Sequence, residues 1–516
     1  MLIKINGEEI DIEDGSTIKD AIEFSNAPYN PGSILCLIKG EKEIQKNINK
    51  FKIKTPKGSI IIEMSDNEDA KPLVDIWKNQ YKELIGCYIR WFSSTEVAVG
   101  PFVTDLKPTH NEYKYKDLEV ILSLSGFSNE STHIIFSKDK HNSTYGVPDC
   151  NRGVFAEVIG GRKTINKLNE SDTILDIEPI IERTTTTDSA SVYDLDTELK
   201  EGYELYTYVE IKPNFDSPNS VEHLFSLIDD GVIKVGYDSN SFVGFYQLQG
   251  IGRPLEKTGV RKRGTITMRN TGSGIGNIYI YRSERVEVNS HTIVGNVIKG
   301  MELIDSAKLG DTITVKSNPQ RIMTLNKTQK EANDFLDSMG IEQVREGFKD
   351  DDAVVVSQVP ETTLDIIKEG KVTTTAYPEK DITVIELTDK APRTVWYFRK
   401  LTGLIEKPIG QLKVHFAFPG MNMSIFEGDS KAAKGLIPEN TPNVDTIDAG
   451  IIGVTNMVKK NVGLIGVRFE PNNDFGPTAE PFEATNIIGK VITDLELIGK
   501  LKEGEILYVR ELKHES

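Results

Sequence analysis

Cysteine is scarce in this sequence: only Cys36, Cys87 and Cys150 occur among 516 residues. Small secreted domains that lack a large core depend on several disulfides, and this chain has too few cysteines for such a scaffold. Three cysteines also fall short of the four that a self-contained zinc or iron–sulfur site of the all-cysteine type requires. The cysteine content fits a reducing compartment, so we expect a cytoplasmic protein.

The sequence also lacks long apolar runs, and its basic residues are fewer than its acidic ones. No stretch approaches the ~18–20 apolar residues of a membrane-spanning helix, and residues 1–15 lack the apolar core of a signal peptide. The chain has 61 Lys and Arg against 78 Asp and Glu, a formal net charge of −17. An acidic field repels phosphate backbones and anionic lipids, so we expect neither nucleic acid nor a membrane as a partner.

One pattern recurs three times. A small residue is followed two positions later by valine, within a strand-like run that passes into an amphipathic turn. The three copies span residues 152–168, 291–307 and 485–501. Their small residues are Ala156, Gly295 and Gly489. Such internal similarity indicates that one folding unit was duplicated.

A second shared segment precedes each copy. It is an apolar strand that carries a glutamate at a fixed place, Glu63, Glu210 or Glu386. A short helical pattern then begins near a proline, whose backbone angle is pre-set for a first helical turn. The third copy stands farther from the second than the second does from the first, which places an insertion at residues 318–379.

Residues 1–54 are predicted to form a separate small unit. Two alternating strands flank Asn6 and Gly7, a strong signal for a type I′ hairpin turn. Ser16 and Thr17 then cap a helix, and a third strand follows it. This order of hairpin, helix and strand predicts a β-grasp fold.

The chain therefore divides into five units, mainly β with α+β parts. The predicted boundaries are 1–54 for the β-grasp unit, 55–182, 203–317 and 380–512 for the three repeat units, and 318–379 for the small α+β insertion. The polar run at 184–191 predicts a linker between the first two repeat units.

The third repeat unit resembles a cyclophilin. Residues 382–398 are similar to the opening strand and helix of that family, and residues 426–429 to its Gln-Gly-Gly-Asp turn. In the second unit, residues 264–273 resemble the Gly-x-x-x-Met-Ala-Asn segment and residues 291–301 the closing His-Thr-x-x-Gly…Gly-Met segment. The resemblance implies a small closed β-barrel capped by helices, repeated three times.

The resemblance does not extend to prolyl isomerase chemistry. Cyclophilins use an arginine on one barrel strand and a glutamine with a phenylalanine on a neighbouring strand. Residues 241–247 and 414–420, which correspond to the arginine region, contain no arginine, and Ile278 and Ile465 stand in place of the glutamine. An aliphatic side chain neither donates nor accepts a hydrogen bond. We therefore expect catalytically inactive cyclophilin-like barrels and no enzyme.

The insertion resembles a PASTA module, the unit associated with penicillin-binding proteins and kinases, in the order of residues 325–336, Gly340 and 354–360. The whole arrangement is similar to the methanogenesis marker protein 3 family of methanogenic archaea. Three segments carry this resemblance most clearly, residues 263–282, 291–305 and 472–491.

Membership of that family implies a cytoplasmic protein of the assembly that activates methyl-coenzyme M reductase by ATP-dependent electron delivery to its nickel tetrapyrrole. The implied partners are the reductase with its small operon-encoded subunit, methanogenesis marker proteins 7 and 17, and an ATP-binding activation component. We expect a non-catalytic scaffold that helps hold iron–sulfur clusters at subunit interfaces. The alternatives are a cyclophilin-type peptidyl-prolyl isomerase or foldase for a methanogenesis protein, and a cluster carrier in its own right.

Cys150 is the foremost candidate metal ligand. It lies in the turn-rich loop 146–153 beside Arg152, whose charge is expected to lower the pKa of the thiol and favour iron binding. A joint site with His141 is a hypothesis that rests on their sharing one region, and further ligands must then come from partner chains. The alternative is a thiol without a role, the commoner fate of a lone cysteine.

Other motifs are better explained structurally. Residues 272–276 are rich in glycine but lack the lysine and the strand-to-helix setting of a phosphate loop. Residues 261–263 form a small basic cluster that either docks an acidic partner or is simply exposed. Cys36 and Cys87 are expected to pack in cores, because their neighbours are apolar.

Overall fold

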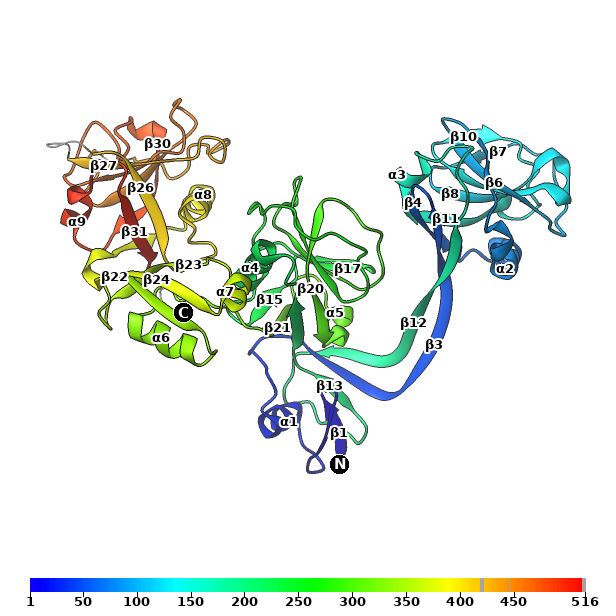
Figure 1. The fold of residues 1–516 in the computed structure, drawn as a ribbon, viewed down its shortest axis with the longest axis horizontal. Coiled ribbons are helices and arrows are strands. Elements are labelled where there is room, and N and C mark those ends of the chain that lie inside the picture. The colour runs from blue at the N-terminus through cyan, green and yellow to red at the C-terminus, as the bar shows by residue number, and fades with distance from the viewer. Residues whose placement is uncertain (418–421, 444, 513–516) are drawn as a thin grey trace.

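The computed structural model describes residues 1–417, 422–443 and 445–512. The fold is mainly β, as predicted, and is built from barrels and half-barrels (Figure 1). The first repeat lies at one end of the longest axis and the third at the other, with the second repeat between them. In the described part of the chain, no helix is long and apolar enough to cross a membrane.

The N-terminal unit contains elements from two distant parts of the sequence. These are β1 (Leu2–Ile5), β2 (Glu8–Asp11), α1 (Ile18–Ser25), the start of β3 (Leu35–Thr55) and β13 (Glu204–Tyr206). Asn6 and Gly7 have φ values of 51° and 86°, which confirms the predicted turn. The Thr17 side chain accepts from the Asp20 N–H, and the Asp20 carboxylate accepts from Thr17, which completes a capping box.

Strand β13 pairs with both β1 and β3, and Leu199 and Leu205 complete the small core around Ile3 and Leu37. The predicted boundary at residue 54 lies within β3. The N-terminal unit is therefore closed only when the chain returns to it after the first repeat.

The connection to the first repeat is a long two-stranded ribbon. Strands β3 and β12 (Asp176–Val192) pair antiparallel from Asp176 opposite Lys54 to Val192 opposite Leu35. Figure 1 shows the two strands running side by side from the N-terminal unit to the first repeat. The linker predicted at 184–191 is instead part of β12, because backbone pairing between strands needs no apolar side chains.

The third repeat is a closed barrel in the strand order β25-β30-β28-β29-β27-β26-β31. Its strands are β25 (Thr383–Leu387), β26 (Gly410–Phe416), β27 (Met423–Phe426), β28 (Ile451–Thr455), β29 (Ile465–Arg468), β30 (Thr485–Val491) and β31 (Ile506–Glu511). The first and last strands pair in parallel and close the barrel. Its helices are α8 (Pro392–Thr402) and α9 (Leu495–Lys500).

The second repeat follows the same order with one interruption. Its strands are β14 (Val209–Pro213), β15 (Val232–Lys234), β16 (Tyr237–Asp238), β17 (Phe242–Phe245), β18 (Thr265–Arg269), β19 (Ile278–Tyr281), β20 (His291–Lys299) and β21 (Thr312–Ser317). Strands β15 and β16 replace the single β26, so the sheet has two ends where the third repeat closes. Its helices are α4 (Pro218–Leu227) and α5 (Met301–Ser306).

The first repeat keeps this order over six strands, β4-β11-β8-β9-β6-β5. They are β4 (Gly58–Met64), β5 (Ile89–Phe92), β6 (Glu96–Phe102), β8 (Glu119–Leu124), β9 (Thr132–Ser137) and β11 (Val154–Gly160), with helices α2 (Lys71–Gln80) and α3 (Arg162–Ile165). Strand β3 pairs with β4 at the place where the other repeats pair their first and last strands. A separate pair, β7 (Tyr113–Tyr115) and β10 (His141–Ser143), lies outside this sheet.

The predicted correspondence between the repeats is confirmed. The glutamate strands β4, β14 and β25 each pair antiparallel with the strand that carries the small residue, β11, β20 or β30. A Cβ atom at Gly295 would lie 2.7 Å from the carbonyl oxygen of Lys212, and one at Gly489 would lie 2.1 Å from that of Glu386. The small residue is therefore needed for the close approach of these two strands.

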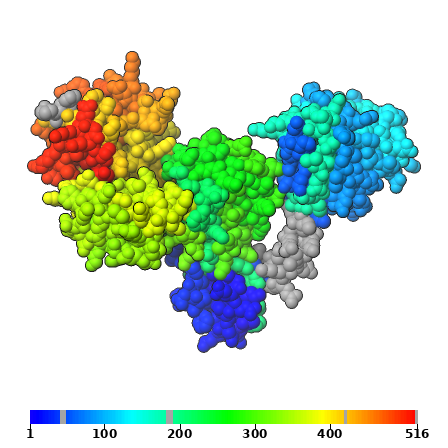
Figure 2. Space-filling view, viewed as in Figure 1, coloured from blue at the N-terminus to red at the C-terminus, as the bar shows by residue number. Residues whose placement is uncertain are grey.

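The insertion is a three-stranded sheet with two helices. Its elements are α6 (Gln329–Asp337), β22 (Glu342–Gly347), β23 (Val354–Val359), α7 (Thr363–Glu369) and β24 (Lys371–Tyr377). The helices and strands agree with the small α+β unit predicted for this segment. Helix α6 begins with a capping box between Thr328 and Glu331. Figure 2 shows the insertion in contact with the second and third repeats on this face of the molecule.

Candidate functional site

His141 lies on β10 with both ring nitrogens engaged inside the first repeat. Its Nδ1 lies 2.8 Å from the carbonyl oxygen of Asp139, and its Nε2 lies 2.6 Å from the hydroxyl of Tyr145. The ring also packs against Tyr115. A metal at this histidine would have to displace one of these hydrogen bonds.

Cys150 is half-buried, and its environment differs from the predicted one. Burial, together with the charges of Asp149 and Asp69, raises the pKa of the thiol above its ordinary value. The Arg152 guanidinium does not lower the pKa of the Cys150 thiol, because it is directed elsewhere. It donates to the carbonyl oxygen of Lys114 and to the Glu119 carboxylate at 2.9 Å. The expected lowering of the Cys150 pKa is therefore wrong.

The two predicted ligands pack against different clusters. Cys150 lies beside the main core of the first repeat, whereas the ring of His141 packs on Tyr115 and Tyr145 in a separate outer cluster. Among residues 1–417, 422–443 and 445–512, no group of three or more His, Cys, Asp or Glu side chains is arranged to hold a metal ion. Cys36 is buried as predicted, and Cys87 is half-buried at the edge of the first core.

The outer faces of the three repeats differ in what covers them. Side chains alternate along a strand, so every second residue of the central strands points away from the barrel core. In the first repeat these outward residues include Ala98, Ile121 and Ile135, which pack under Tyr115 and Tyr145. The β7–β10 pair thus seals this face with a second hydrophobic cluster.

In the third repeat the outer face is sealed by a loop. A Cβ atom at Gly466 would lie 2.2 Å from the carbonyl oxygen of Pro477. The neighbouring Arg468 is 7% exposed and donates from Nε to the carbonyl oxygen of Gly476 at 3.1 Å. Ile465, which stands in the glutamine position by sequence, faces the barrel core.

The second repeat presents aromatic side chains on the same face. Ile278 faces the core here as well, and its neighbours point outward. We call the outward set the aromatic face, which consists of Tyr237, Phe242, Tyr246, Tyr279, Tyr281 and His291. The rings run in contact from Tyr237 through Tyr246 and Tyr279 to His291, with centroid separations of 6.3, 6.3 and 5.3 Å. A Cβ atom at Gly244 would lie 2.8 Å from the Tyr246 ring, so this glycine makes room for the aromatic row. Its strand, β17, holds the segment predicted to correspond to the cyclophilin arginine region.

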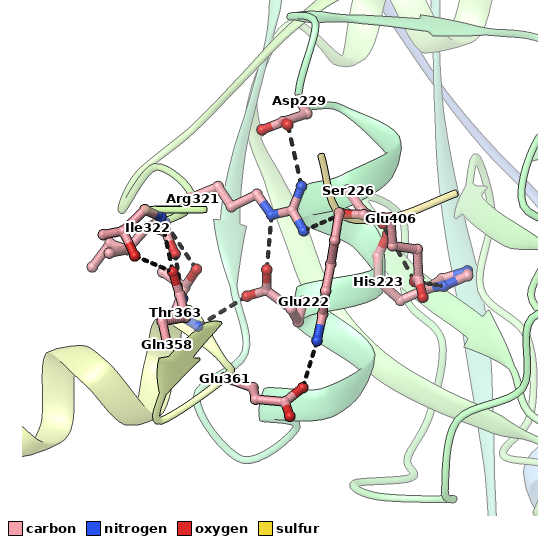
Figure 3. A network of polar contacts seen from close by, with 12 residues as sticks. Glu222, His223, Ser226, Asp229, Arg321, Ile322, Gln358, Glu361, Thr363 and Glu406 are labelled. Atoms are coloured by element: carbon pink, nitrogen blue, oxygen red, sulfur yellow. Dashed lines mark hydrogen bonds and ion pairs between the residues drawn. The ribbon is translucent and has the colours of Figure 1, made fainter. Parts of the chain in front are cut away.

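A second polar site joins the second repeat, the insertion and the third repeat (Figure 3). His223 on α4 is fully buried, with Nδ1 2.8 Å from Glu406 Oε1 and Nε2 2.8 Å from the carbonyl oxygen of Gly276. Arg253 also pairs with Glu406. Burial raises the pKa of Glu406, but the hydrogen bond from His223 and the charge of Arg253 outweigh it and hold that pKa below its ordinary value.

Arg321 links all three parts of this junction. Its Nε lies 2.8 Å from Glu222 Oε1, and one Nη lies 3.1 Å from Asp229, both in the second repeat. The other Nη donates to the carbonyl oxygen of Glu406 at 2.7 Å. Glu222 also accepts from the backbone N–H of Thr363 at the start of α7. The signal for this network is absent from local sequence, because its members lie far apart along the chain.

A cavity of about 670 Å³ lies at the same junction. Its charged lining side chains include Glu222, Glu406 and Arg253, which pair across the unit boundaries, and Lys407, which pairs with Glu361 at 2.7 Å. The charges therefore stabilise the junction itself.

Comparison with known proteins places the chain among proteins from methanogens. A UPF0288 protein of Methanothermobacter thermautotrophicus is 52% identical, over 99% of this chain and 98% of its own length. Those of Methanosarcina acetivorans and Methanopyrus kandleri are 38% and 33% identical, over 99% and 100% of this chain and 96% and 100% of their own. The chain belongs to the UPF0288 family.

Part of this UPF0288 protein also matches a domain family. Residues 383–512 match the family model described as "Putative peptidyl-prolyl cis-trans isomerase domain". Among solved structures, cyclophilin AquaCyp293 from Hirschia baltica is 11% identical with a TM-score of 0.20, over 26% of this chain and 76% of its own. A cyclophilin-type isomerase of Cryptosporidium parvum is 14% identical with a TM-score of 0.19, over 27% of this chain and 99% of its own.

Proposed function

We propose that this UPF0288 protein is a non-catalytic scaffold of the assembly that reductively activates methyl-coenzyme M reductase, as the resemblance to methanogenesis marker protein 3 implies. Relatives of nearly equal length in Methanothermobacter, Methanosarcina and Methanopyrus support a role tied to methanogenesis. The units of the scaffold would be an N-terminal β-grasp unit, three cyclophilin-like barrels and the PASTA-like insertion.

The observation that carries the scaffold proposal is the use of the buried charges at the junction. His223, Glu406 and Arg321 each bond across the boundary to another unit. Ion pairs and hydrogen bonds of this kind fix the relative orientation of the surfaces they join. Fixed surfaces on several barrels suit a protein that holds different partners at set positions.

The proposed partners are the reductase with its small operon-encoded subunit, marker proteins 7 and 17, and the ATP-binding component, in the cytoplasm. Iron–sulfur clusters would lie at the interfaces with these partners. Cys150 is the proposed contribution of this chain, with His141 as a second ligand only if its bonds to Asp139 and Tyr145 are exchanged. A cubane needs about four ligands, so the remainder would come from partner chains.

Anaerobic affinity purification of the tagged full chain, with the bound proteins identified by mass spectrometry, tests the scaffold proposal. We expect the reductase subunits and the marker proteins to be recovered together. A matched control is the double variant His223→Ala and Arg321→Ala, in which the junction is loosened and simultaneous recovery of several partners should fall. Recovery of no methanogenesis protein by the unaltered chain would refute the proposal.

The second candidate function is prolyl isomerisation, which the domain family matched by residues 383–512 favours. We expect the full chain to leave the isomerisation rate of a prolyl tetrapeptide at its spontaneous value. An acceleration that saturates with substrate and is lost in Arg468→Ala would establish the isomerase instead, because Arg468 is the arginine on the outer face of that barrel.

A further inference from the structure

Two arginines beside the aromatic face have no acidic partner. The guanidinium of Arg261 lies 5.0 Å over the Tyr281 ring, donates to the Tyr281 hydroxyl at 2.8 Å, and donates from Nε to the carbonyl oxygen of Val286 at 3.1 Å. Arg269 donates from Nε to the carbonyl oxygen of Thr271 at 2.9 Å. Neither makes an ion pair with any residue that the structure describes.

Two other arginines in the same repeat form ion pairs, whereas Arg285 donates to the carbonyl oxygen of Ile159 and to the hydroxyl of Ser241. Arg263 forms an ion pair with Asp305, and Arg282 pairs with Asp238 at 2.7 Å. The chain as a whole has 17 more acidic than basic groups. Two guanidinium groups without an ion pair among the described residues therefore lie together at one face of an acidic chain.

The pKa of His291 reflects both the burial of this residue and the charge of the two arginines. His291 stands directly opposite Arg269 in the pairing of β18 with β20, and its Nδ1 lies 3.0 Å from the hydroxyl of Thr267. Burial, with the charges of Arg261 and Arg269, lowers the pKa of His291 to about 4. The imidazole is thus neutral at neutral pH, and the positive charge of the face comes from the arginines.

Asn277 adds a buried group without a partner. It is 4% exposed, and its Oδ1 has no hydrogen-bond partner in the described ranges, while its Nδ2 reaches the Tyr279 hydroxyl at 3.4 Å. This side chain lies at the end of the glycine-rich loop that precedes β19.

The glycine-rich loop positions Arg269 and does not cradle a phosphate. A Cβ atom at Gly274 would lie 3.1 Å from Cδ of Arg269, so the loop leaves room for this side chain. The backbone N–H groups of Ile275, Gly276 and Asn277 all donate to nearby carbonyl oxygens. The structure thus supports the prediction that residues 272–276 form a turn, and it leaves anion recognition to the guanidinium groups.

We propose that the aromatic face binds an acidic peptide segment of a protein partner. Guanidinium groups match the geometry of carboxylates, and toward the residues that the structure describes Arg269 uses one of the five donors of its planar group. Tyr237, which is 44% exposed, with Tyr246 and Phe242 beside it, offers aromatic surface for the backbone and apolar side chains of the segment. Tyr279 and Tyr281 are buried beneath this outer layer, so a bound segment would contact Tyr237, Phe242 and Tyr246.

This inference rests on the proposed scaffold function and names the chemistry of one of its partners. It also distinguishes the second repeat from the first and third, whose corresponding faces are covered by their own chain. The two arginines of the basic cluster at 261–263 have different surroundings. Arg261 lies over Tyr281 at the aromatic face, whereas Arg263 pairs with Asp305 outside it.

The test compares Arg269→Gln with Arg263→Gln, which removes the same charge from the same repeat outside the aromatic face. Each tagged full chain is purified anaerobically and its partners are quantified by mass spectrometry. We expect Arg269→Gln to reduce recovery of at least one partner tenfold or more, and Arg263→Gln to leave recovery within twofold. Recovery of every partner by Arg269→Gln at the unaltered level overturns the inference and leaves the scaffold proposal standing.

A second measurement is independent of the assembly. Fluorescence anisotropy follows binding of the full chain to a labelled decapeptide of alternating Glu and Tyr, with an alternating Lys and Tyr peptide as the charge-reversed probe. We expect binding of the first peptide only, at least tenfold weaker in Arg269→Gln, and no displacement by inorganic phosphate at equal concentration. Equal binding of both peptides, no binding of the acidic peptide, or displacement by phosphate would each overturn the inference. If the unaltered chain recovers no partner but binds the acidic peptide, the scaffold proposal alone has failed.

Discussion

The imidazole of His223 donates to Glu406 across the junction between the second and third repeats, with 2.8 Å between Nδ1 and Oε1. Its Nε2 lies 2.8 Å from the carbonyl oxygen of Gly276. Both ring nitrogens are thus engaged, one by a carboxylate of the third repeat and one by a backbone carbonyl of the second repeat. A fully buried imidazole, hydrogen-bonded to a carboxylate from another unit, therefore lies at the centre of the junction.

Removal of the imidazole should weaken the junction strongly. We expect His223→Ala to lower the free energy of unfolding of the second and third repeats by about 3 kcal/mol, because it leaves a mostly buried carboxylate short of one partner. Urea unfolding followed by the fluorescence of Trp396 on α8 measures this loss, in a chain whose other two tryptophans, Trp77 and Trp91, are replaced by phenylalanine. Lys500→Ala is the control, since Lys500 and Glu496 form an exposed pair whose loss should fall within error. An equal effect of both variants would show that the buried pair contributes little.

The same pair predicts a dependence of stability on pH. The pKa of Glu406 is held below its ordinary value of 4.5, so its contribution to stability is present above pH 4.5 and is lost as the pH falls through the folded-state value. The difference in melting temperature between the unaltered chain and Glu406→Gln should therefore be constant from pH 7 to 5 and shrink below pH 4.5. Thermal unfolding at half-unit intervals measures this. A difference that stays constant down to pH 3 would contradict the assignment.

A glycine in the second repeat tests the close approach between its strands. Gly300 has a φ of +83°, and a Cβ atom there would lie 2.2 Å from the carbonyl oxygen of Tyr208. Gly310 has a φ of +94° but no atom within 4 Å of such a Cβ. Gly300→Ala should destabilise the protein by at least about 1 kcal/mol more than Gly310→Ala, since both substitutions strain a positive φ and only one adds a clash. Equal melting temperatures would show that the backbone relaxes freely at Gly300.

The cluster hypothesis makes a prediction about Cys150. If this thiol is a ligand in the assembled complex, Cys150→Ala should reduce the iron recovered per complex, whereas Cys87→Ala should not. Iron analysis of anaerobically purified complexes measures both, and the raised pKa of the thiol implies that iron loading improves at alkaline pH. Unchanged iron in Cys150→Ala would remove this residue from the site.

Local signals predicted individual elements well. Pro72, Pro218 and Pro392 each lie at the start of a helix, as the sequence indicated. The hairpin at Asn6 and Gly7 and the cap at Thr17 were predicted in the same way. Each of these features depends on residues within a few positions, so the sequence contains the whole signal.

Pairings between distant segments escaped prediction. The polar run at 184–191 resembles a linker because its partner strand, β3, lies far away in the sequence. Strand β13 completes the N-terminal unit from about 200 residues away, and amino-acid composition does not predict such a pairing. Sequence comparison also assigned Ile278 and Ile465 to the position of the cyclophilin glutamine, but both side chains face the barrel core. A shift of one residue along a strand is enough to move a side chain from the outer face to the core. His223 and Glu406 are 183 residues apart, so nothing local marked them as partners.

The scaffold proposal depends most directly on whether this UPF0288 protein holds several methanogenesis proteins at once. The decisive measurement is native mass spectrometry of the complex that a tagged full chain recovers from a methanogen under anaerobic conditions. The scaffold proposal predicts one species that contains the chain together with reductase subunits and at least one marker protein. A chain recovered alone, or one that turns over prolyl peptides while binding no methanogenesis protein, would contradict it.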